Sequence, residues 1–275
     1  MPKIITKLKP EAFWPKSMDK ECDKAARILK SFTSLTSSSG SRASPTAGRN
    51  IRIPPSALAN AKGLAIFTGL RAGMWLSGAG GSGLVVARLP DGSWSPPSGF
   101  LVRSVGAGIV GGVDIYDCVC VLNTEEAVAA YAKSRVSLGG EVAVAAGPLG
   151  GSLTDGKGDV NPVWSYTKSR GVWGGLTVDG TVIIARPDAN AEFYGEAVEV
   201  ECIFRGEVPG ATAENTGGKM KQEKGRLMWP EGARQLTEVL KVVEGKNADA
   251  AVMNQVGEEP TPGDLVLQPE GQKSA

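Results

Sequence analysis

The chain is 275 residues long, with 41% hydrophobic residues, 6% aromatic residues and 37 glycines. It contains no histidine, which excludes histidine-activated nucleophiles and the commonest general base. The net charge of +1 hides an uneven distribution: residues 1–50 carry ten basic and four acidic side chains, residues 51–195 carry eleven of each, and residues 196–275 carry nine basic and fourteen acidic ones. We expect an anionic surface to attract the basic end and to repel the acidic end.

The clearest predicted helix lies near the start of the chain. Apolar residues recur at steps of three and four from Met18 to Phe32, which gives one continuous apolar stripe. Ser17 is a good N-cap, and Lys30 lies near the end, where a cation favours the helix dipole. Basic residues flank the stripe. Such a helix either packs on the rest of the protein or lies at a membrane surface, and periodicity alone favours packing.

A Ser-rich stretch at 33–50 predicts a flexible loop, and Pro54 and Pro55 begin a short helix through Ala61. From Gly63 the pattern is that of β-strands. The predicted strands are Leu64–Gly69, Met74–Ser77, Gly83–Leu89, Phe100–Ile109, Val113–Leu122, Glu141–Ala146, Val163–Ser169, Gly171–Val178 and Thr181–Arg186. Turn residues at 90–92 and at 179–180 predict hairpins between antiparallel neighbours.

Three further helices are predicted: 125–133, capped by Thr124, then 189–193 and 231–243. Residues 245–275 show little hydrophobic pattern and are predicted to be disordered. No βαβ alternation appears, which argues against a parallel doubly wound sheet. The fold class that we expect is α+β, with a mainly antiparallel curved sheet or barrel-like body and a few packed helices.

The chain shows neither a signal peptide nor a run of about 20 apolar residues, so any membrane contact is expected to be peripheral. The four cysteines do not have zinc-site spacing, and Cys118 and Cys120 share one strand face, where they are poorly placed to bridge each other. We interpret the cysteines as reduced and buried in a cytosolic protein.

Glycine and carboxylate motifs offer little chemistry. Two stretches fit G-x-G-x-x-G, beginning at Gly78 and Gly106, but both lead into strand-like sequence and not into the helix that a pyrophosphate site requires. Asp114 and Asp117 are three apart, so on a strand they face opposite sides. We therefore expect no enzymatic activity, no cofactor and no metal.

Several strings recur in a recognisable order. They are IPPSALANAKGLAIFTGLRAG (53–73), SGAGGSGLVVARLPDGSWSPPSG (77–99), GAGIVGGVDIYDCVCVLNTEEAV (106–128), AGPLG (146–150), YTKSRGVWGGLTVDGTVI (166–183) and FYG (193–195). Their order and spacing resemble the SYLF domain, which is found in endocytic adaptors that bind phosphoinositides and actin filaments. The resemblance covers roughly residues 14–205.

The resemblance extends to the predicted first helix. The family pattern of a proline, a basic amphipathic helix and a phenylalanine appears here as Pro15, KAARIL at 24–29 and Phe32. In the family this segment is implicated in binding phosphoinositide membranes. The resemblance implies these lipid-facing candidates: Lys16, Lys20, Lys24, Arg27 and Lys30. Asp23 departs from a position that is often basic in relatives, and residues 1–12 extend beyond the usual start.

The body departs from the family pattern as well. Relatives often carry arginine where this chain has Ala79 and Gly151, so any contact made by those arginines is lost here. Arginine and lysine remain at Arg71, Arg88, Lys168 and Arg170, which we interpret as ordinary solvated strand charges. Many relatives end in an SH3 domain, which recruits proline-rich partners. This chain ends in an acidic tail without a plausible SH3 barrel.

The expected organisation is a basic extension at 1–16, a SYLF-like domain at 17–205, a linker and helix at 206–244, and a disordered acidic tail at 245–275. We predict a non-enzymatic, phosphoinositide-binding peripheral membrane protein of the cytoplasm that links membrane to actin in endocytosis. The alternative is a protein that binds or bundles actin filaments without a lipid role. No nucleic-acid partner is expected.

Overall fold

The computed structural model describes residues 14–33, 52–132, 135–146, 150–152, 162–209, 227–257 and 261–263. The predicted extension before residue 14, nearly all of the predicted loop at 33–50 and parts of the predicted linker and tail lie outside these residues. Of residues 135–146 and 150–152, only the backbone is described.

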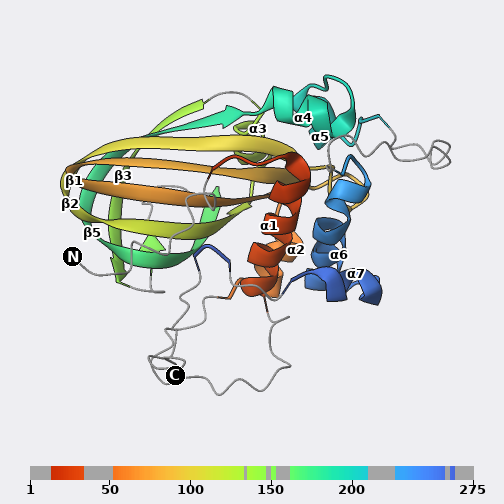
Figure 1. The fold of residues 1–275 in the computed structure, drawn as a ribbon, viewed down its shortest axis with the longest axis horizontal. Coiled ribbons are helices and arrows are strands. Elements are labelled where there is room, and N and C mark those ends of the chain that lie inside the picture. Colours follow the sequence, from red (N-terminus) through yellow and green to blue (C-terminus); the bar gives the residue numbers. More distant parts are fainter. Residues whose placement is uncertain are drawn as a thin grey trace, which may run out of the picture.

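Five strands form one antiparallel sheet in the order β1-β2-β5-β3-β4. Their bounds are β1 (Gly63–Ala87), β2 (Ser98–Leu122), β3 (Arg135–Ala146), β4 (Gly150–Ser152) and β5 (Val163–Ala185). The sheet is strongly curved, and the described strands do not close into a barrel (Figure 1). The predicted α+β class with a mainly antiparallel curved sheet is confirmed.

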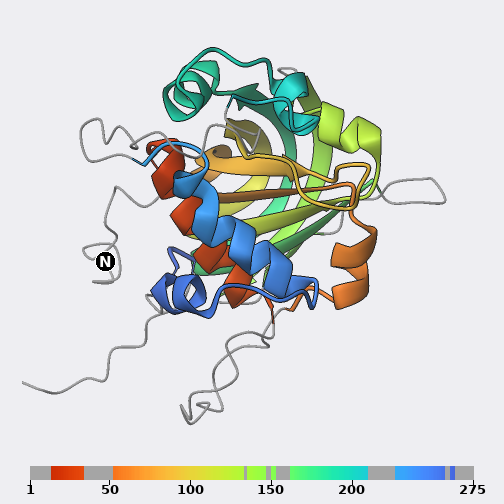
Figure 2. The same ribbon diagram turned by 90° about the vertical axis from the view of Figure 1, so that its right-hand side faces the viewer.

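The helices gather at one end of this sheet, and the opposite end of β1, β2 and β5 extends beyond them (Figure 1). Figure 2 shows α6 lying next to α1 at the helical end. The bounds are α1 (Met18–Ser31), α2 (Pro55–Asn60), α3 (Glu125–Ala129), α4 (Pro187–Tyr194), α5 (Val200–Phe204), a 3-10 turn η5 (Glu231–Ala233), α6 (Arg234–Val243) and α7 (Ala250–Gln255). No helix among the described residues is long and apolar enough to cross a bilayer.

Strand β1 bends back on itself at Met74–Leu76, so that its two halves lie side by side (Figure 1). At the open end, the backbone N–H of Arg88 donates to the carbonyl of Lys62 at 2.7 Å. Midway, the halves are so close that a Cβ added at Gly83 would lie 2.1 Å from the carbonyl oxygen of Ile66. Glycine is required there because any side chain would strike the neighbouring backbone.

Strands β2 and β5 follow the same bend around β1. Residues 63–74 of β1 pair with 111–122 of β2, and after a register shift residues 76–85 pair with 98–107. β5 pairs with β2 along its whole length, from Val163 opposite Leu122 to Ala185 opposite Phe100. The predicted short strands are therefore the arms of longer, bent strands.

The two predicted hairpin turns have different outcomes. The turn at 90–92 is confirmed: Gly92 has a φ of 81°, and Arg88 pairs with Trp94 across it. The turn at 179–180 is wrong, because Asp179 and Gly180 lie inside β5, opposite residues of β2. Pairing with both β2 and β3 keeps this segment extended, which overrides the local turn preference of Asp-Gly.

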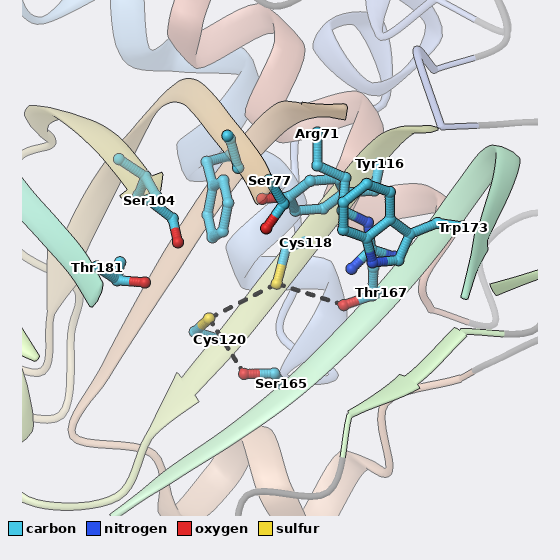
Figure 3. Close-up of a pocket in the computed structure, with 14 residues that line it drawn as sticks. Arg71, Ser77, Ser104, Tyr116, Cys118, Cys120, Ser165, Thr167, Trp173 and Thr181 are labelled. Atoms are coloured by element: carbon cyan, nitrogen blue, oxygen red, sulfur yellow. Dashed lines mark hydrogen bonds between the residues drawn. The ribbon is translucent and has the colours of Figure 1, made fainter. Parts of the chain in front are cut away.

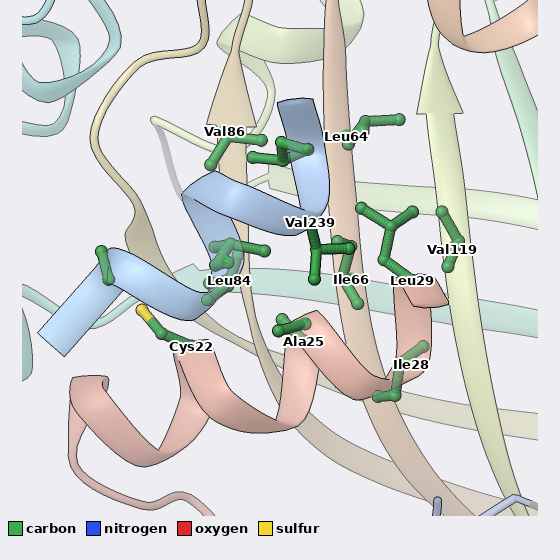
Figure 4. Close-up of a cluster of buried hydrophobic side chains, with 14 of the residues drawn as sticks. Cys22, Ala25, Ile28, Leu29, Leu64, Ile66, Leu84, Val86, Val119 and Val239 are labelled. Atoms are coloured by element: carbon green, nitrogen blue, oxygen red, sulfur yellow. The ribbon is translucent and has the colours of Figure 1, made fainter. Parts of the chain in front are cut away.

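Helix α1 packs its whole apolar stripe against the outer face of the sheet. Met18, Cys22, Leu29 and Phe32 are at most 2% exposed. Their neighbours come from both halves of β1, from β2 and from α6, and include Leu64, Ile66, Leu84, Val86, Val119 and Val239 (Figure 4). The predicted Ser17 is the N-cap residue, but its side chain makes no capping hydrogen bond.

A second core fills the inner, concave side of the sheet. It contains alternate residues of the same strands, among them Phe67, Phe100 and Cys118, with Tyr131 from the segment after α3. Phe67 and Tyr131 each contact Phe100 edge-on, with ring centroids 5.9 and 4.9 Å away. Alternate residues of one strand thus pack into the outer and the inner core in turn. Because both faces of β1 and β2 are buried near the helices, the sequence of these strands is almost continuously apolar there.

The helices after the sheet largely follow their predicted positions. Thr124 caps α3 by accepting a hydrogen bond from the Ala127 N–H, although α3 ends before the predicted residue 133. The predicted disorder from residue 245 is wrong at 250–256: α7 begins after the capping Asp249, and Val252 and Val256 are buried. Two apolar residues on one short helix suffice here because α1 and α6 provide the packing surface.

The bend of β1 makes a testable prediction at Gly83. We expect Gly83→Ala to lower the free energy of unfolding by about 2 kcal/mol or more, because the methyl group would overlap the backbone of the facing half-strand. Gly80→Ala is the matched control, since a Cβ there meets no atom within 4 Å. Chemical denaturation measures both. Equal stability of the two variants would contradict the side-by-side arrangement.

Candidate functional site

The junction between α1 and the sheet contains a buried ion pair. Lys24 Nζ lies 2.6 Å from Glu21 Oε2, with side-chain exposures of 6% and 0%. Lys24 also donates to the Ser82 carbonyl at 3.1 Å, and the Ser82 hydroxyl donates to Glu21 Oε1 at 2.8 Å. The Lys16 backbone N–H donates to the same oxygen, and Arg186 Nη1 lies 3.7 Å from it. Each charge therefore has the partners that make its burial tolerable.

This network corrects one of the five predicted lipid-facing residues. Lys24 points into the junction with Ser82 of β1 and is not available to a membrane in this structure. The sequence carries a local signal for its pairing, because Glu21 and Lys24 are three apart on a helix. It carries no signal for Ser82, which is 58 residues away.

The other four predicted residues lie nearer the surface but are not equivalent. Lys16 is exposed, and Lys20 is 57% exposed with Nζ 3.7 Å from Asp23. Arg27 is half-buried on the same helix. Lys30 donates to the carbonyl of Val256, which ties the end of α1 to the segment after α7. The structure thus leaves the first three as the cationic surface of α1.

The four strand cations do not behave as ordinary solvated charges where their side chains are described. Arg71 pairs with Asp114 at 3.0 Å and lies between the rings of Tyr116 and Trp173, 5.1 and 5.2 Å from their centroids. Arg88 stacks on Trp94 and pairs with Glu244.

Lys168 donates to the Ser31 carbonyl at 2.6 Å and lies over the Phe32 ring, so it caps the end of α1. The side chain of Arg170 is outside the described residues. Internal partners therefore hold Arg71, Arg88 and Lys168, and the interpretation of them as solvated charges is wrong.

Magnitudes favour the docked position of α1 over a membrane-bound one. Each basic residue near an anionic leaflet contributes about 1 kcal/mol. Transfer of α1 to a bilayer would uncover Leu64, Ile66, Leu84 and Val119 on the sheet, and a fully buried aliphatic side chain is worth about 2 kcal/mol. It would also break the buried ion pair. The helix consequently stays on the sheet.

The concave face of the sheet encloses a cavity of about 250 Å³ (Figure 3). Its described lining combines aromatic rings, the Arg71 guanidinium, two thiols and the hydroxyl groups of serine, threonine and tyrosine; the hydroxyls are those of Ser77, Ser104, Tyr116, Ser165, Thr167 and Thr181. No carboxylate or imidazole is among these lining residues. The cavity therefore offers hydrogen bonds and aromatic stacking.

Cys118 and Cys120 project into this cavity with their sulfur atoms 3.6 Å apart (Figure 3). Their mutual hydrogen bond, followed by burial, raises the pKa of Cys118, and the same hydrogen bond lowers the pKa of Cys120. Thr167 donates to Cys118, and Ser165 lies 3.5 Å from Cys120. Both cysteines are free thiols, as are Cys22 and Cys202.

The chain thus forms a bent antiparallel sheet with a docked N-terminal helix. The profile of one protein family, described as "Las17-binding protein actin regulator" and named Ysc84, matches residues 103–243. The chain belongs to this Ysc84 family, the family of the SYLF domain that the sequence resembles.

Individual relatives agree with this assignment. "Protein YSC84" of Saccharomyces cerevisiae is 42% identical over 199 residues, which are 70% of this chain and 41% of that protein. "LAS seventeen-binding protein 3" of the same yeast is 41% identical over the same share of this chain and 42% of its own length. The human "SH3 domain-containing YSC84-like protein 1" is 39% identical over 71% of this chain and 56% of its own. The chain thus spans about half the length of these relatives. No solved structure matches it.

The buried ion pair predicts a large effect of Lys24 on stability. We expect Lys24→Met to lower the free energy of unfolding by about 3 kcal/mol, because Glu21 would remain buried without its closest cation. Lys20→Met is the matched control on the same helix, with an expected change within about 0.5 kcal/mol, because the Lys20 side chain is 57% exposed and lies 3.7 Å from its partner Asp23.

A double-mutant cycle separates the ion pair from packing. Adding Glu21→Leu to Lys24→Met is expected to recover part of the lost stability, since it removes the uncompensated charge. Strictly additive losses in thermal or chemical unfolding would show that the two side chains do not interact.

Proposed function

We propose that this chain is a non-enzymatic, actin-regulating module of endocytosis that attaches peripherally to phosphoinositide membranes. Family membership is the single observation that carries the actin part: the matched profile is described as an actin regulator. The cavity fits this proposal because its described lining offers hydrogen-bonding groups and aromatic rings. Membrane contact by α1 and filament contact by another surface would link the two.

The membrane part rests on the cations that α1 leaves at the surface. Lys20 and Arg27 of α1, with Lys16 just before it, present positive charge on the solvent side of a helix whose apolar stripe is already buried. Headgroup phosphates would meet these side chains without insertion of the helix. At about 1 kcal/mol for each cation, less the effect of Asp23 beside Lys20, such contact is weak and reversible. Lys30, held by Val256, would contribute less.

The second candidate is a protein that binds or bundles actin filaments without a lipid role. The burial of Lys24 favours it, because this removes one of five cations from the predicted membrane surface. The remaining basic side chains of α1 would then meet acidic side chains of the filament. The two candidates differ in whether vesicles compete for the same surface.

Sedimentation with vesicles and with actin filaments tests the proposal. We expect Lys20→Glu/Arg27→Glu to weaken binding to phosphoinositide vesicles by about tenfold, because two positive charges near the headgroups become negative. The matched control is Arg52→Glu/Lys62→Glu, which has the same charge change on exposed residues outside α1. Actin co-sedimentation of the unmodified chain supports the family role.

Three outcomes of this experiment bear on the choice. Loss of vesicle binding in the α1 variant alone supports headgroup contact by α1. Equal loss in both variants would indicate an effect of net charge only. Co-sedimentation with actin in the absence of any vesicle binding would replace the proposal with the second candidate.

A further inference from the structure

The end of the sheet opposite the helices exposes a group of large apolar side chains, which we call the apex. It consists of Met74, Trp75 and Leu76 at the bend of β1 and Ile109 at the bend of β2. Their side chains are 74, 66, 65 and 70% exposed. Three consecutive exposed apolar residues at a turn are unfavourable in water unless another molecule covers them.

Additional apolar residues extend the apex along one face of the sheet. The register places Leu76, Ala107 and Val178 in one row across β1, β2 and β5. The next row on the same face of the sheet contains Val105. Val105 and Val178 are 65 and 62% exposed. By alternation this is the face on which α1 packs, since Val119 and Val121 lie on the same side of β2 as Val105. The helices cover one end of this face and leave the apex open (Figure 1).

The backbone of Trp75 does not favour tryptophan. Its φ of 65° lies in the left-handed region, where glycine and asparagine are the favourable residues. A large side chain there costs stability, and its 66% exposure shows that little packing within the described structure compensates. The fold therefore gives no reason for tryptophan at this position, and contact with another molecule does.

A firm base supports the apex from the concave side. Trp173 and Val110 form a separate buried pair beneath the bend. Arg71 lies between the rings of Trp173 and Tyr116 and is fixed by Asp114. The apolar tip thus rests on packed side chains, so binding does not require the entropy cost of ordering a loop.

The surroundings of the apex fit a lipid bilayer better than a protein. The segments 69–81 and 103–113 contain no aspartate or glutamate, and Arg103 is exposed; Arg71, the other arginine there, is paired with Asp114. Tryptophan is enriched where a membrane meets water, and a bilayer accepts a convex tip without a complementary shape. A specific protein interface requires about 800 Å² from each partner, which a projecting tip of four side chains does not supply.

We infer that the apex inserts into the interfacial region of an anionic bilayer and provides the apolar membrane contact that α1, buried on the sheet, does not provide. This rests on the proposed membrane attachment and adds the site of insertion. Because apex and α1 lie on one face of the sheet, a bilayer along that face meets apolar side chains at one end and the α1 cations at the other. The inserted tip anchors the chain, and the cations select for anionic headgroups.

Vesicle binding with apex variants tests the inference. The probe is vesicles of phosphatidylcholine containing a phosphatidylinositol bisphosphate. Replacing the bend by serine, asparagine and serine (Met74→Ser/Trp75→Asn/Leu76→Ser) is expected to weaken binding by about tenfold or more, because the apolar contact is removed. Asparagine suits the φ of residue 75, so thermal unfolding should be unchanged or slightly raised. Trp164→Ser, which removes a tryptophan 54% exposed at the helical end of the sheet, is the matched control.

Fluorescence locates the insertion directly. Lipids brominated in their acyl chains are expected to quench part of the tryptophan emission of the bound protein, and Trp75→Phe should abolish this quenching while binding is retained. Trp164→Phe should leave the quenching in place.

The outcomes separate the inference from the proposed function. If the unmodified chain binds vesicles, but the bend variant binds equally well and Trp75 is not quenched, the inference is overturned and membrane attachment stands. If the unmodified chain does not bind vesicles, both are wrong. Loss of actin co-sedimentation by the bend variant, with vesicle binding intact, would overturn the inference in favour of a protein partner.

Discussion

The buried ion pair between Lys24 and Glu21, completed by Ser82 of β1, holds α1 on the sheet. This contact decides which side chains of the helix remain exposed to a binding partner. Charges in an interior are tolerated only with close partners, so the pair fixes the position of the helix along the strands as well as its presence. The apolar stripe from Met18 to Phe32 then lies entirely inside the outer core. The basic side chains that remain outside are few, and they lie on a helix that cannot insert while it is docked.

The bend of the long strands separates the molecule into a covered end and an open end. Close approach of the two halves of β1 requires glycine at Gly83, and the same bend brings Met74–Leu76 to the far end of the sheet. Helices cover the outer face near the open ends of the strands and stop before the bend (Figure 1). Apolar side chains that would be core elsewhere are consequently exposed at the apex. If this Ysc84-family chain attaches at the apex, the apex would lie deepest in the bilayer, and the helical end would lie farther out.

Local patterns predicted much of this fold. The apolar steps of three and four from Met18 to Phe32 predicted the first helix and its buried face, and Thr124 predicted the start of α3. Both signals are local, because helix caps and amphipathic stripes depend on residues that are neighbours in sequence. The continuity of the strands was not predicted. A strand that bends sharply in its middle looks like two strands with a loop, and only pairing with residues far along the chain shows that it continues.

The site was predictable only in part. Lys24 and Lys20 look alike in the sequence, but contact with Ser82, 58 residues away, buries one and leaves the other in water. Met74–Ser77 fitted a strand, and nothing local shows that Trp75 occupies a left-handed turn, since glycine is the usual signal for that conformation. Charges and apolar residues acquire their roles here from tertiary contacts, which composition and periodicity do not contain.

Hydrogen exchange of the α1 backbone tests most directly whether this helix belongs to the core. We predict that amides of residues 18–31 exchange as slowly as those of the central strands, and that anionic vesicles leave this protection unchanged. Rapid exchange of α1 in solution, or a selective change in its protection when vesicles are added, would mean that the helix leaves the sheet and that the docked arrangement is not its working state.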